Sequence, residues 1–213
     1  MEINGRANIK MYNQDCMKAL QDMDENQFDL AIVDPPYGKD IIKTGKVGGD
    51  NKGIAFTNYG SNDWDKNTPS KEYFNELFRV SKNQIIFGSN YFELPPTRCN
   101  IIWDKMQKFS GADFELAWTS FDKASKAFRM SRVEAYSAGK IHPTQKPIKL
   151  YEWLLMNYAE KGNKILDTHL GSGSIAIACH NLDFPLIACE LNPFFYKEAV
   201  ERLKKHQMQI RMF

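Results

Sequence analysis

The sequence has no long hydrophobic run and little cysteine. No stretch of its 213 residues approaches the roughly 20 apolar residues of a membrane-spanning helix, so we expect no membrane partner. The first residues lack the basic and apolar regions of a secretory signal, which predicts a cytoplasmic protein. The cysteines are scattered without the paired spacing of a metal site, at Cys16, Cys99, Cys179 and Cys189. We therefore expect no metal centre.

The sequence also has almost no excess of charge of either sign. The 28 basic and 26 acidic residues leave a net charge of +2. This balance permits a polyanionic partner without requiring one. The hydrophobic share of 43% and the absence of repeats or linkers predict a single domain over residues 1–213.

Apolar runs typical of strands alternate with helical patterns along the chain. The expected strands are 8–12, 28–33, 84–87, 100–103, 114–119, 164–167 and 185–190. The expected helices are 16–21, 70–81, 147–159, 174–181 and 193–207. This alternation predicts an α/β sheet with helices on both faces. Residues 38–69 lack such a pattern and are too long for a passive connection, so we expect a mobile functional loop there.

The most informative stretch is Asp34-Pro35-Pro36-Tyr37, which directly follows the apolar strand 28–33. Neither proline can donate to a sheet ladder, so the chain must leave the sheet at the carboxyl end of a strand. Open α/β sheets place ligands at this end. A carboxylate, a proline carbonyl and an aromatic ring can together hold an amino group on a flat ring. The turn therefore suggests chemistry on the exocyclic amine of a nucleobase, although a rigid surface bend is the alternative.

A second motif joins a strand to a Gly-rich turn and a helix start over residues 164–174. Its glycines, Gly171 and Gly173, allow close approach of the backbone to a ligand. One strand and helix later, Glu190 ends an apolar strand and can accept both hydroxyls of a ribose. The pattern also fits a nicotinamide-dependent oxidoreductase. However, Asp167 before the turn would repel phosphates and suits an ammonium group, as in S-adenosyl-L-methionine.

These motifs, in this order, resemble the amino-methylating DNA methyltransferases whose catalytic motif precedes the cofactor motif. Asp34 to Tyr37 resembles their catalytic turn, and Asp167 to Ser174 their D-P-F-x-G-S-G-T loop. The segment 142–147, H-P-T-Q-K-P, and Asp15-Cys16 are also similar to family motifs. Two departures are Thr168-His169 in place of Pro-Phe, and Ser174 in place of Thr.

The resemblance implies a Rossmann-like fold with a seven-stranded mixed sheet, DNA as partner and S-adenosyl-L-methionine as cofactor. It assigns catalysis to Asp34, Pro35, Pro36 and Tyr37. It assigns cofactor binding to Asp15, Cys16, Lys146, Asp167, His169, Gly171, Ser172, Gly173, Ser174 and Glu190. It implies a short target-recognition segment at 120–141, and the basic residues of the loops suggest DNA contacts at Lys39, Lys43, Lys46, Arg129, Arg132 and Lys140.

The implied reaction is site-specific methylation of adenine N6 in a flipped-out base. Cytosine N4 is the nearest alternative, since the same turn serves either amine, but family usage favours Ser for cytosine at the first position, where this chain has Asp34. An inactive DNA-binding module would be expected to lose the aspartate or the glycines, and both are present. A homodimer and a cognate restriction endonuclease remain open.

Overall fold

The structure is a computed structural model that describes residues 2–4, 7–38, 46–47, 57–58, 68–106, 112–136, 141–142 and 144–209. Most of the predicted loop 38–69 lies outside these ranges, as do Lys39, Lys43, Lys140 and the side chain of Lys46.

Strands and helices alternate through most of the described chain. The strands are β1 (Glu2–Asn4), β2 (Asn8–Asn13), β3 (Phe28–Val33), β4 (Lys46–Val47), β5 (Thr57–Asn58), β6 (Ser81–Phe87), β7 (Asn100–Asp104), β8 (Phe114–Thr119), β9 (Lys126–Arg129), β10 (Ile165–Asp167) and β11 (Leu186–Glu190). The helices are α1 (Cys16–Gln21), α2 (Lys71–Val80), the short 3₁₀ helix η2 (Ser89–Tyr91), α3 (Arg132–Ala135), α4 (Ile148–Tyr158), α5 (Ser174–Leu182) and α6 (Pro193–Met208).

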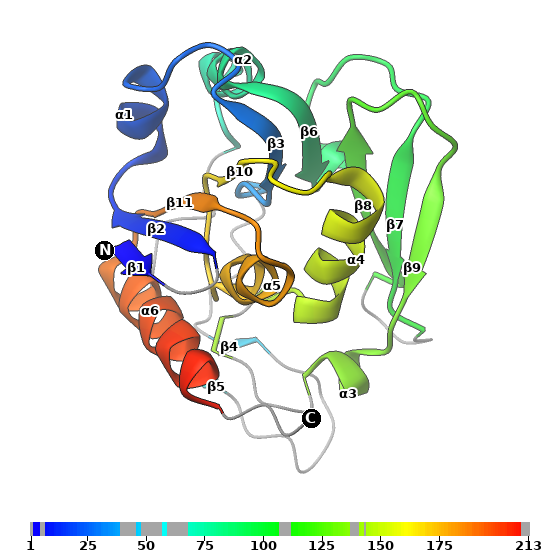
Figure 1. The fold of residues 1–213 in the computed structure, drawn as a ribbon. Helices are drawn as coiled ribbons and strands as arrows, with labels where there is room; N and C mark the ends of the chain where they lie inside the picture. The colour runs from blue at the N-terminus through cyan, green and yellow to red at the C-terminus, as the bar shows by residue number, and fades with distance from the viewer. Residues whose placement is uncertain are drawn as a thin grey trace.

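Nine of the described strands form one mixed sheet in the order β1-β2-β11-β10-β3-β6-β8-β7-β9. The five strands from β2 to β6 in this order are mutually parallel. Strand β8 then runs antiparallel to both β6 and β7. Strands β4 and β5 form a separate antiparallel pair. The sheet thus combines a parallel centre with a reversed strand, β8, between β6 and β7 at the right of Figure 1.

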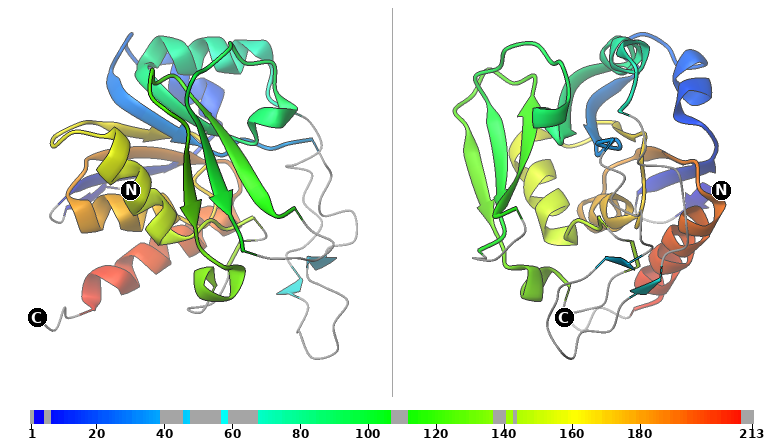
Figure 2. Two further views of the ribbon diagram at one scale, coloured as in Figure 1. Left: turned by 90° about the vertical axis from the view of Figure 1, so that its right-hand side faces the viewer. Right: turned by 180° about the vertical axis from the view of Figure 1, so that it is seen from behind.

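Helices cover both faces of the sheet, and each face has its own hydrophobic core. Helices α1 and α2 lie on one face, and α4, α5 and α6 on the other (Figures 1 and 2). Alternate residues of a strand serve the two cores because side chains point to opposite faces with a period of two. In β3, Leu30 and Ile32 pack toward α4 and α5, whereas Ala31 and Val33 pack toward α2. The buried stretches of the central strands are consequently mostly apolar.

The helices begin where the sequence offers caps. The side chain of Asp15 accepts hydrogen bonds from the first backbone N–H groups of α1, and Ser70 does the same for α2. Asn192 caps α6, whose first residue is Pro193, a residue suited to the first helical turn because its missing N–H would be unpaired there. The loops after β2 and β11 therefore turn sharply into helices at the edge where these strands end.

The α/β fold with helices on both faces is confirmed, with two corrections. The described residues form a nine-stranded sheet instead of the expected seven, because β1 and β9 add a short strand at each side. Strand β9 and helix α3 also lie within the segment 120–141 expected to recognise the target. The side chains of β9 and α3 are largely exposed or half-buried. Their sequences therefore lack the regular spacing of apolar residues that would have predicted them. None of the helices in the described ranges has the length and apolar character needed to cross a membrane.

Two glycines with positive φ allow backbone strain to be separated from packing. At Gly173 (φ 71°) a Cβ would lie 2.9 Å from the Cβ of Ala199 in α6, whereas at Gly162 (φ 88°) it would meet nothing within 4 Å. We expect Gly162→Ala to destabilise the fold by about 1 kcal/mol through strain alone. Gly173→Ala should cost about 1–3 kcal/mol more because α5 and α6 must move apart. Urea unfolding of the cofactor-free protein measures both, and equal losses would contradict this account of the packing.

Candidate active site

Four acidic residues from separate parts of the chain meet at one edge of the sheet. Asp15 follows β2, Asp34 follows β3, Asp167 ends β10 and Glu190 ends β11. These strands are parallel neighbours, so their carboxyl ends lie side by side. A cavity of about 530 Å³ opens at this edge and is lined from Asp15 and Glu190 to Asp34. The two motifs, more than a hundred residues apart in the sequence, thus share one cavity.

The catalytic turn holds its carboxylate between a hydroxyl and an ammonium group. The hydroxyl of Tyr37 donates to Oδ1 of Asp34, and Nζ of Lys146 forms an ion pair with Oδ2. The side chain of Asp34 is 15% exposed and that of Lys146 only 2%. Burial raises the pKa of Asp34, and the charge of Lys146 opposes this rise. Asp34 is therefore a buried acceptor whose ionised form depends on its neighbours.

The ring of Tyr37 packs against Gly88, where no side chain could be accommodated. Gly88 follows β6 with φ 71°, and any Cβ at this residue would overlap the Tyr37 ring. Tyr37 also stacks on Tyr91 with ring centroids 5.1 Å apart and meets the edge of Phe92 at 6.1 Å. The loop after β6 therefore fixes the plane of the Tyr37 ring.

The Gly-rich turn is tied to the next strand by a carboxylate. Oε2 of Glu190 accepts a hydrogen bond from the N–H of Gly171 at 2.8 Å, and Oε1 accepts from the N–H of Asn192 at the same distance. Burial raises the pKa of Glu190, and these N–H groups partly offset the rise. Gly171 and Gly173 both have positive φ, which lets the turn close from Leu170 to Gly173. Glu190 thus clamps the turn while lining the cavity.

A chain of hydrogen bonds holds His169, which replaces the family's phenylalanine. The hydroxyl of Tyr73 lies 2.7 Å from that of Thr168, which lies 2.8 Å from Nδ1 of His169. Nε2 of His169 faces the thiol of Cys16 at 4.0 Å. Burial lowers the pKa of His169 to about 4 and raises that of the Cys16 thiol to about 12. Both groups are therefore neutral near neutral pH.

Asp167 lies behind the cavity wall. Its side chain is 2% exposed and accepts a hydrogen bond from the N–H of His169 at 2.9 Å. Burial raises its pKa to about 8, and the negative charges of Asp34 and Glu190 add to the rise. The edge of the sheet thus holds a carboxylate that is largely protonated below pH 8.

The structure gathers most of the predicted site residues at the cavity. Its lining includes Asp15, Cys16, Asp34, Pro36, Lys146, His169, Gly171, Ser172 and Glu190. Five others are not among the residues that line it, namely Pro35, Tyr37, Asp167, Gly173 and Ser174. Of the predicted DNA contacts, Arg129 is 74% exposed and lies 3.4 Å from Asp104, and Arg132 lies over the ring of Tyr136.

Several site residues were not singled out from the sequence. His142 and Phe195 line the cavity with their rings 4.3 Å apart, and Glu115 forms an ion pair with Lys146 at 3.2 Å. His142 stands in the same H-P-T-Q-K-P segment as Lys146, which was the available signal. Glu115 lies within an expected strand. Its ion pair with Lys146 depends on the order of strands in the sheet, which the sequence pattern does not reveal.

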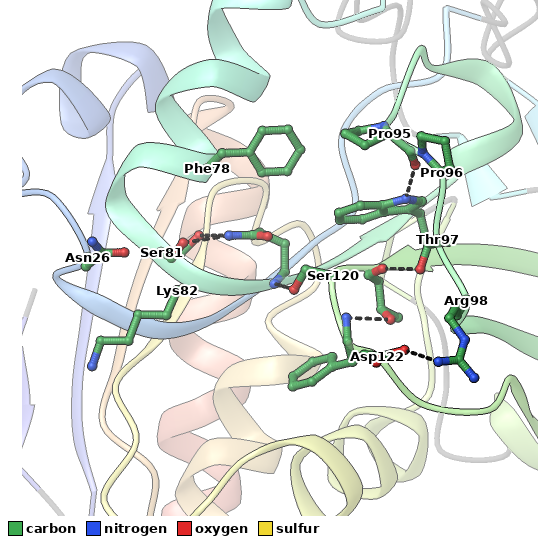
Figure 3. Close-up of a pocket in the computed structure, with 14 residues that line it drawn as sticks. Asn26, Phe78, Ser81, Lys82, Pro95, Pro96, Thr97, Arg98, Ser120 and Asp122 are labelled. Carbon is green, nitrogen blue, oxygen red and sulfur yellow. Dashed lines mark hydrogen bonds and ion pairs between the residues drawn. The ribbon is translucent and has the colours of Figure 1, made fainter.

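A second cavity, of about 510 Å³, lies at the opposite edge of the sheet, where β6 begins and β8 ends. Its charged groups are paired with one another or with neighbours: Arg98 with Asp122 at 2.7 Å (Figure 3), and Lys82 with Asp29 at 2.8 Å. The indole N–H of Trp118 donates to the carbonyl of Pro95. Neither sequence motif reaches this cavity.

Comparison with known proteins identifies relatives of the chain. A family model described as DNA methylase matches residues 96–201. The type II methyltransferase M.HpaI of Haemophilus parainfluenzae is 26% identical over 240 residues, which cover 88% of this chain and 71% of that protein. The type II methyltransferase M2.MboI of Moraxella bovis is 30% identical over 130 residues, covering 60% of this chain and 42% of that protein.

Solved structures share the fold. The M1.HpyAVI–SAM complex superposes with a TM-score of 0.59 at 22% identity, covering 92% of this chain and all of that one. The cytosine-N4-specific PvuII DNA methyltransferase superposes with a TM-score of 0.61 at 12% identity, covering 97% of this chain and 88% of that one. The motifs, their shared cavity, the family model and the relatives agree. Together they support an amino-methylating (adenine-N6 or cytosine-N4) DNA methyltransferase that uses S-adenosyl-L-methionine.

Proposed function

We propose that this protein methylates N6 of adenine in DNA at a specific sequence. The observation that carries the proposal is the shared cavity, which is lined by the catalytic Asp34 and by the cofactor-loop residues Gly171 and Glu190. An acidic first residue of the catalytic turn supports adenine, because the family's cytosine enzymes favour serine there. A nicotinamide-dependent oxidoreductase is set aside, because the family match and the Asp34 turn have no place in it.

The residues of the cavity suit S-adenosyl-L-methionine. Glu190 retains lone pairs on both oxygens beyond its two backbone hydrogen bonds, and these can accept the ribose hydroxyls. Asp15, Cys16 and the neutral His169 provide a surface for the adenine ring. Asp34, and Asp167 once it ionises, would give the region a negative potential that suits a ligand carrying a sulfonium and an ammonium group. When bound, this cofactor supplies an electrophilic methyl group.

The protein's own contribution to the reaction is orientation. A base inside a duplex is out of reach, so it must flip into the site at a cost of a few kcal/mol. Asp34 and the carbonyl of Pro35 accept the two N–H groups of the target amine and direct its lone pair toward the methyl group. Tyr37 fixes the plane of the base. Such positioning can offset roughly 7–11 kcal/mol of a reaction barrier.

DNA contacts are proposed for the basic residues around the recognition segment 120–141. Arg129 stands exposed at the end of β9, and Arg132 begins α3. Lys39, Lys43, Lys46 and Lys140 are proposed to join them from residues whose side chains the structure does not describe. Contacts of this kind to phosphates bind without sequence preference and weaken with salt.

Replacement of Asp34 tests the catalytic assignment. Asp34→Asn keeps the shape of the side chain but removes its charge and one acceptor, so we expect methylation to fall at least about 10²-fold, as for loss of a charged transition-state contact. Binding of S-adenosyl-L-methionine should change by less than about threefold, because Glu190 and the Gly-rich turn stay intact. Glu201→Gln, in an exposed ion pair with Lys204 of α6 and outside the recognition segment, is the control.

The reaction product is read by mass analysis of nucleosides from DNA of cells that express each variant. N6-methyldeoxyadenosine should appear with the wild type and Glu201→Gln and be lost with Asp34→Asn. Appearance of N4-methyldeoxycytidine in its place would overturn the adenine assignment, and full activity of Asp34→Asn would overturn the role of Asp34.

Glu190→Gln tests the clamp on the cofactor turn. An amide has only one acceptor oxygen, so the N–H of Gly171 or that of Asn192 loses its partner. Hydrogen bonds to a charged group contribute about 1.5–3 kcal/mol. We therefore expect the Kd for S-adenosyl-L-methionine, measured by calorimetry, to rise about 10- to 150-fold. Glu201→Gln, in a surface ion pair with Lys204, should bind like the wild type; unchanged binding by Glu190→Gln would remove Glu190 from the cofactor site.

Asp167 makes cofactor binding dependent on pH. Its pKa of about 8 in the free protein leaves it protonated at pH 7, and a nearby cationic ligand favours its ionised form. Binding at pH 7 should therefore release most of one proton, and Asp167→Asn should release almost none. The proton count comes from calorimetry in buffers of different ionisation enthalpy. Equal proton release by both proteins would show that Asp167 does not sense the cofactor charge.

A further inference from the structure

Four charged side chains form a continuous chain that ends at the catalytic carboxylate. Nζ of Lys105 lies 2.9 Å from Oε1 of Glu115, and Oε2 of Glu115 lies 3.2 Å from Nζ of Lys146. Lys146 in turn forms an ion pair with Asp34. Glu115 therefore lies between two ammonium groups, and Lys146 between two carboxylates.

The reversed strand β8 brings Glu115 to this place. Strand β6 ends at the active-site edge, and β8 runs antiparallel to it, so the start of β8 lies at the same edge. The N–H of Gly88, directly after β6, donates to the carbonyl of Leu116 at 2.9 Å. Strand β7 is antiparallel to β8, so Lys105, just after its last residue, also lies at this edge. The position of Glu115 is therefore fixed by backbone pairing on both sides.

Burial leaves Lys146 dependent on its two carboxylates. The side chain is 2% exposed, and Nζ lies 4.5 Å from the centre of the Phe87 ring. A buried ammonium group that loses its only counter-charge is strongly destabilised, whereas one that keeps a second carboxylate is not. Lys146 can therefore withdraw from Asp34 at low cost only while Glu115 is ionised.

The target amine competes with Lys146 for the same acceptor. In the free protein Oδ1 of Asp34 accepts from Tyr37 and Oδ2 from Lys146. Both Asp34 and Lys146 line the cavity, so an incoming N–H donor meets this ion pair first. The amine must replace or share the contact that Lys146 makes.

We infer that Glu115 is a positioning residue for methyl transfer: it holds Lys146 through a second ion pair, so that Lys146 orients Asp34 in the free protein and releases it to the target amine. The inference rests on the proposed function, since it assigns the partner exchange to the amine that Asp34 receives. Lys105 completes the arrangement by neutralising the other oxygen of Glu115.

The charges around Asp34 determine the direction in which its pKa shifts, and this direction can be measured. Burial raises the pKa of Asp34, Lys146 lowers it and Glu115 raises it. Burial also raises the pKa of Glu115, but Lys146 and Lys105 together bring it below its usual value, so Glu115 stays ionised. The titratable groups that face Asp34 from the surrounding elements are Tyr37, Tyr73, Glu115, Lys146, Tyr151 and Asp167.

Two substitutions should move the titration of Asp34 in opposite directions. Glu115→Gln removes a like charge, so the pKa of Asp34 should fall, whereas Lys146→Met removes the opposite charge, so it should rise, each by about one unit or more. The carboxyl carbon of ¹³C-labelled aspartate reports this titration by NMR in the free protein, with Asp34→Asn used for assignment. Shifts in the same direction, or no shift, would overturn the inference.

Kinetics supply the second measurement. Glu115→Gln should lower kcat about 10- to 100-fold, because Lys146 then has no other carboxylate and stays on Asp34, while the Kd for S-adenosyl-L-methionine changes less than about threefold. In a plot of kcat against pH, the acid limb is the fall in kcat on the acid side. Its midpoint should move to lower pH for Glu115→Gln and to higher pH for Lys146→Met. Lys146→Arg, which keeps the charge, should leave the limb in place. Glu201→Gln, in an exposed ion pair with Lys204 of α6, is the control.

The conservative variant Glu115→Asp keeps the inference testable if Glu115→Gln does not fold. Glu115→Asp retains the charge, so its acid limb should stay at the wild-type pH while kcat is intermediate. An acid limb shifted to lower pH in this variant would contradict the role of the Glu115 charge. A wild-type protein that methylates no DNA would overturn the proposed function, while the NMR titration would still test the arrangement of charges. Wild-type methylation with unaltered kcat and limb in Glu115→Gln would overturn the inference alone.

Discussion

The parallel pairing of β10 with β3 on one side and β11 on the other is the constraint on which the active site depends. It places Ile165 beside Leu30 and Asp167 beside Ala188. Because parallel strands end at the same edge, the turn at Asp34 and the Gly-rich turn after Asp167 must open toward each other. No contact between the two motifs is needed to align them. A one-residue change of register would also turn the core residues of β10 to the wrong face.

The same edge concentrates carboxyl groups in a buried environment. Asp34, Glu115, Asp167 and Glu190 lie there with Lys105 and Lys146 among the described residues. Burial disfavours ionised carboxylates, which is why the pKa values of Asp34, Asp167 and Glu190 are raised. A cationic ligand relieves this cost, whereas an anionic one adds to it. The electrostatics therefore suit a sulfonium cofactor and disfavour a pyrophosphate, independently of the glycine pattern.

Hydrophobic periodicity in the sequence predicted the strands and helices well where at least one face of the element is apolar. The bounds of β3, β8 and α1 agree with the sequence expectation, and the catalytic and cofactor turns follow their strands as expected. Strand β9 was missed because it is an edge strand with little burial. Glu115 was missed for a different reason: its contact with Lys146 arises from the reversal of β8 against β6, which no local period encodes. Gly88 likewise acquires its role only from the distant ring of Tyr37.

The departure at Thr168-His169 is compensated by hydrogen bonding. The family's proline and phenylalanine would provide a rigid turn and an apolar ring. Here the hydroxyls of Tyr73 and Thr168 hold the imidazole through Nδ1, and the Tyr73 ring meets it edge to face at 5.4 Å. Burial keeps His169 neutral by lowering its pKa to about 4. A charged imidazole would repel a sulfonium cofactor bound as proposed, so a neutral His169 is compatible with that proposal.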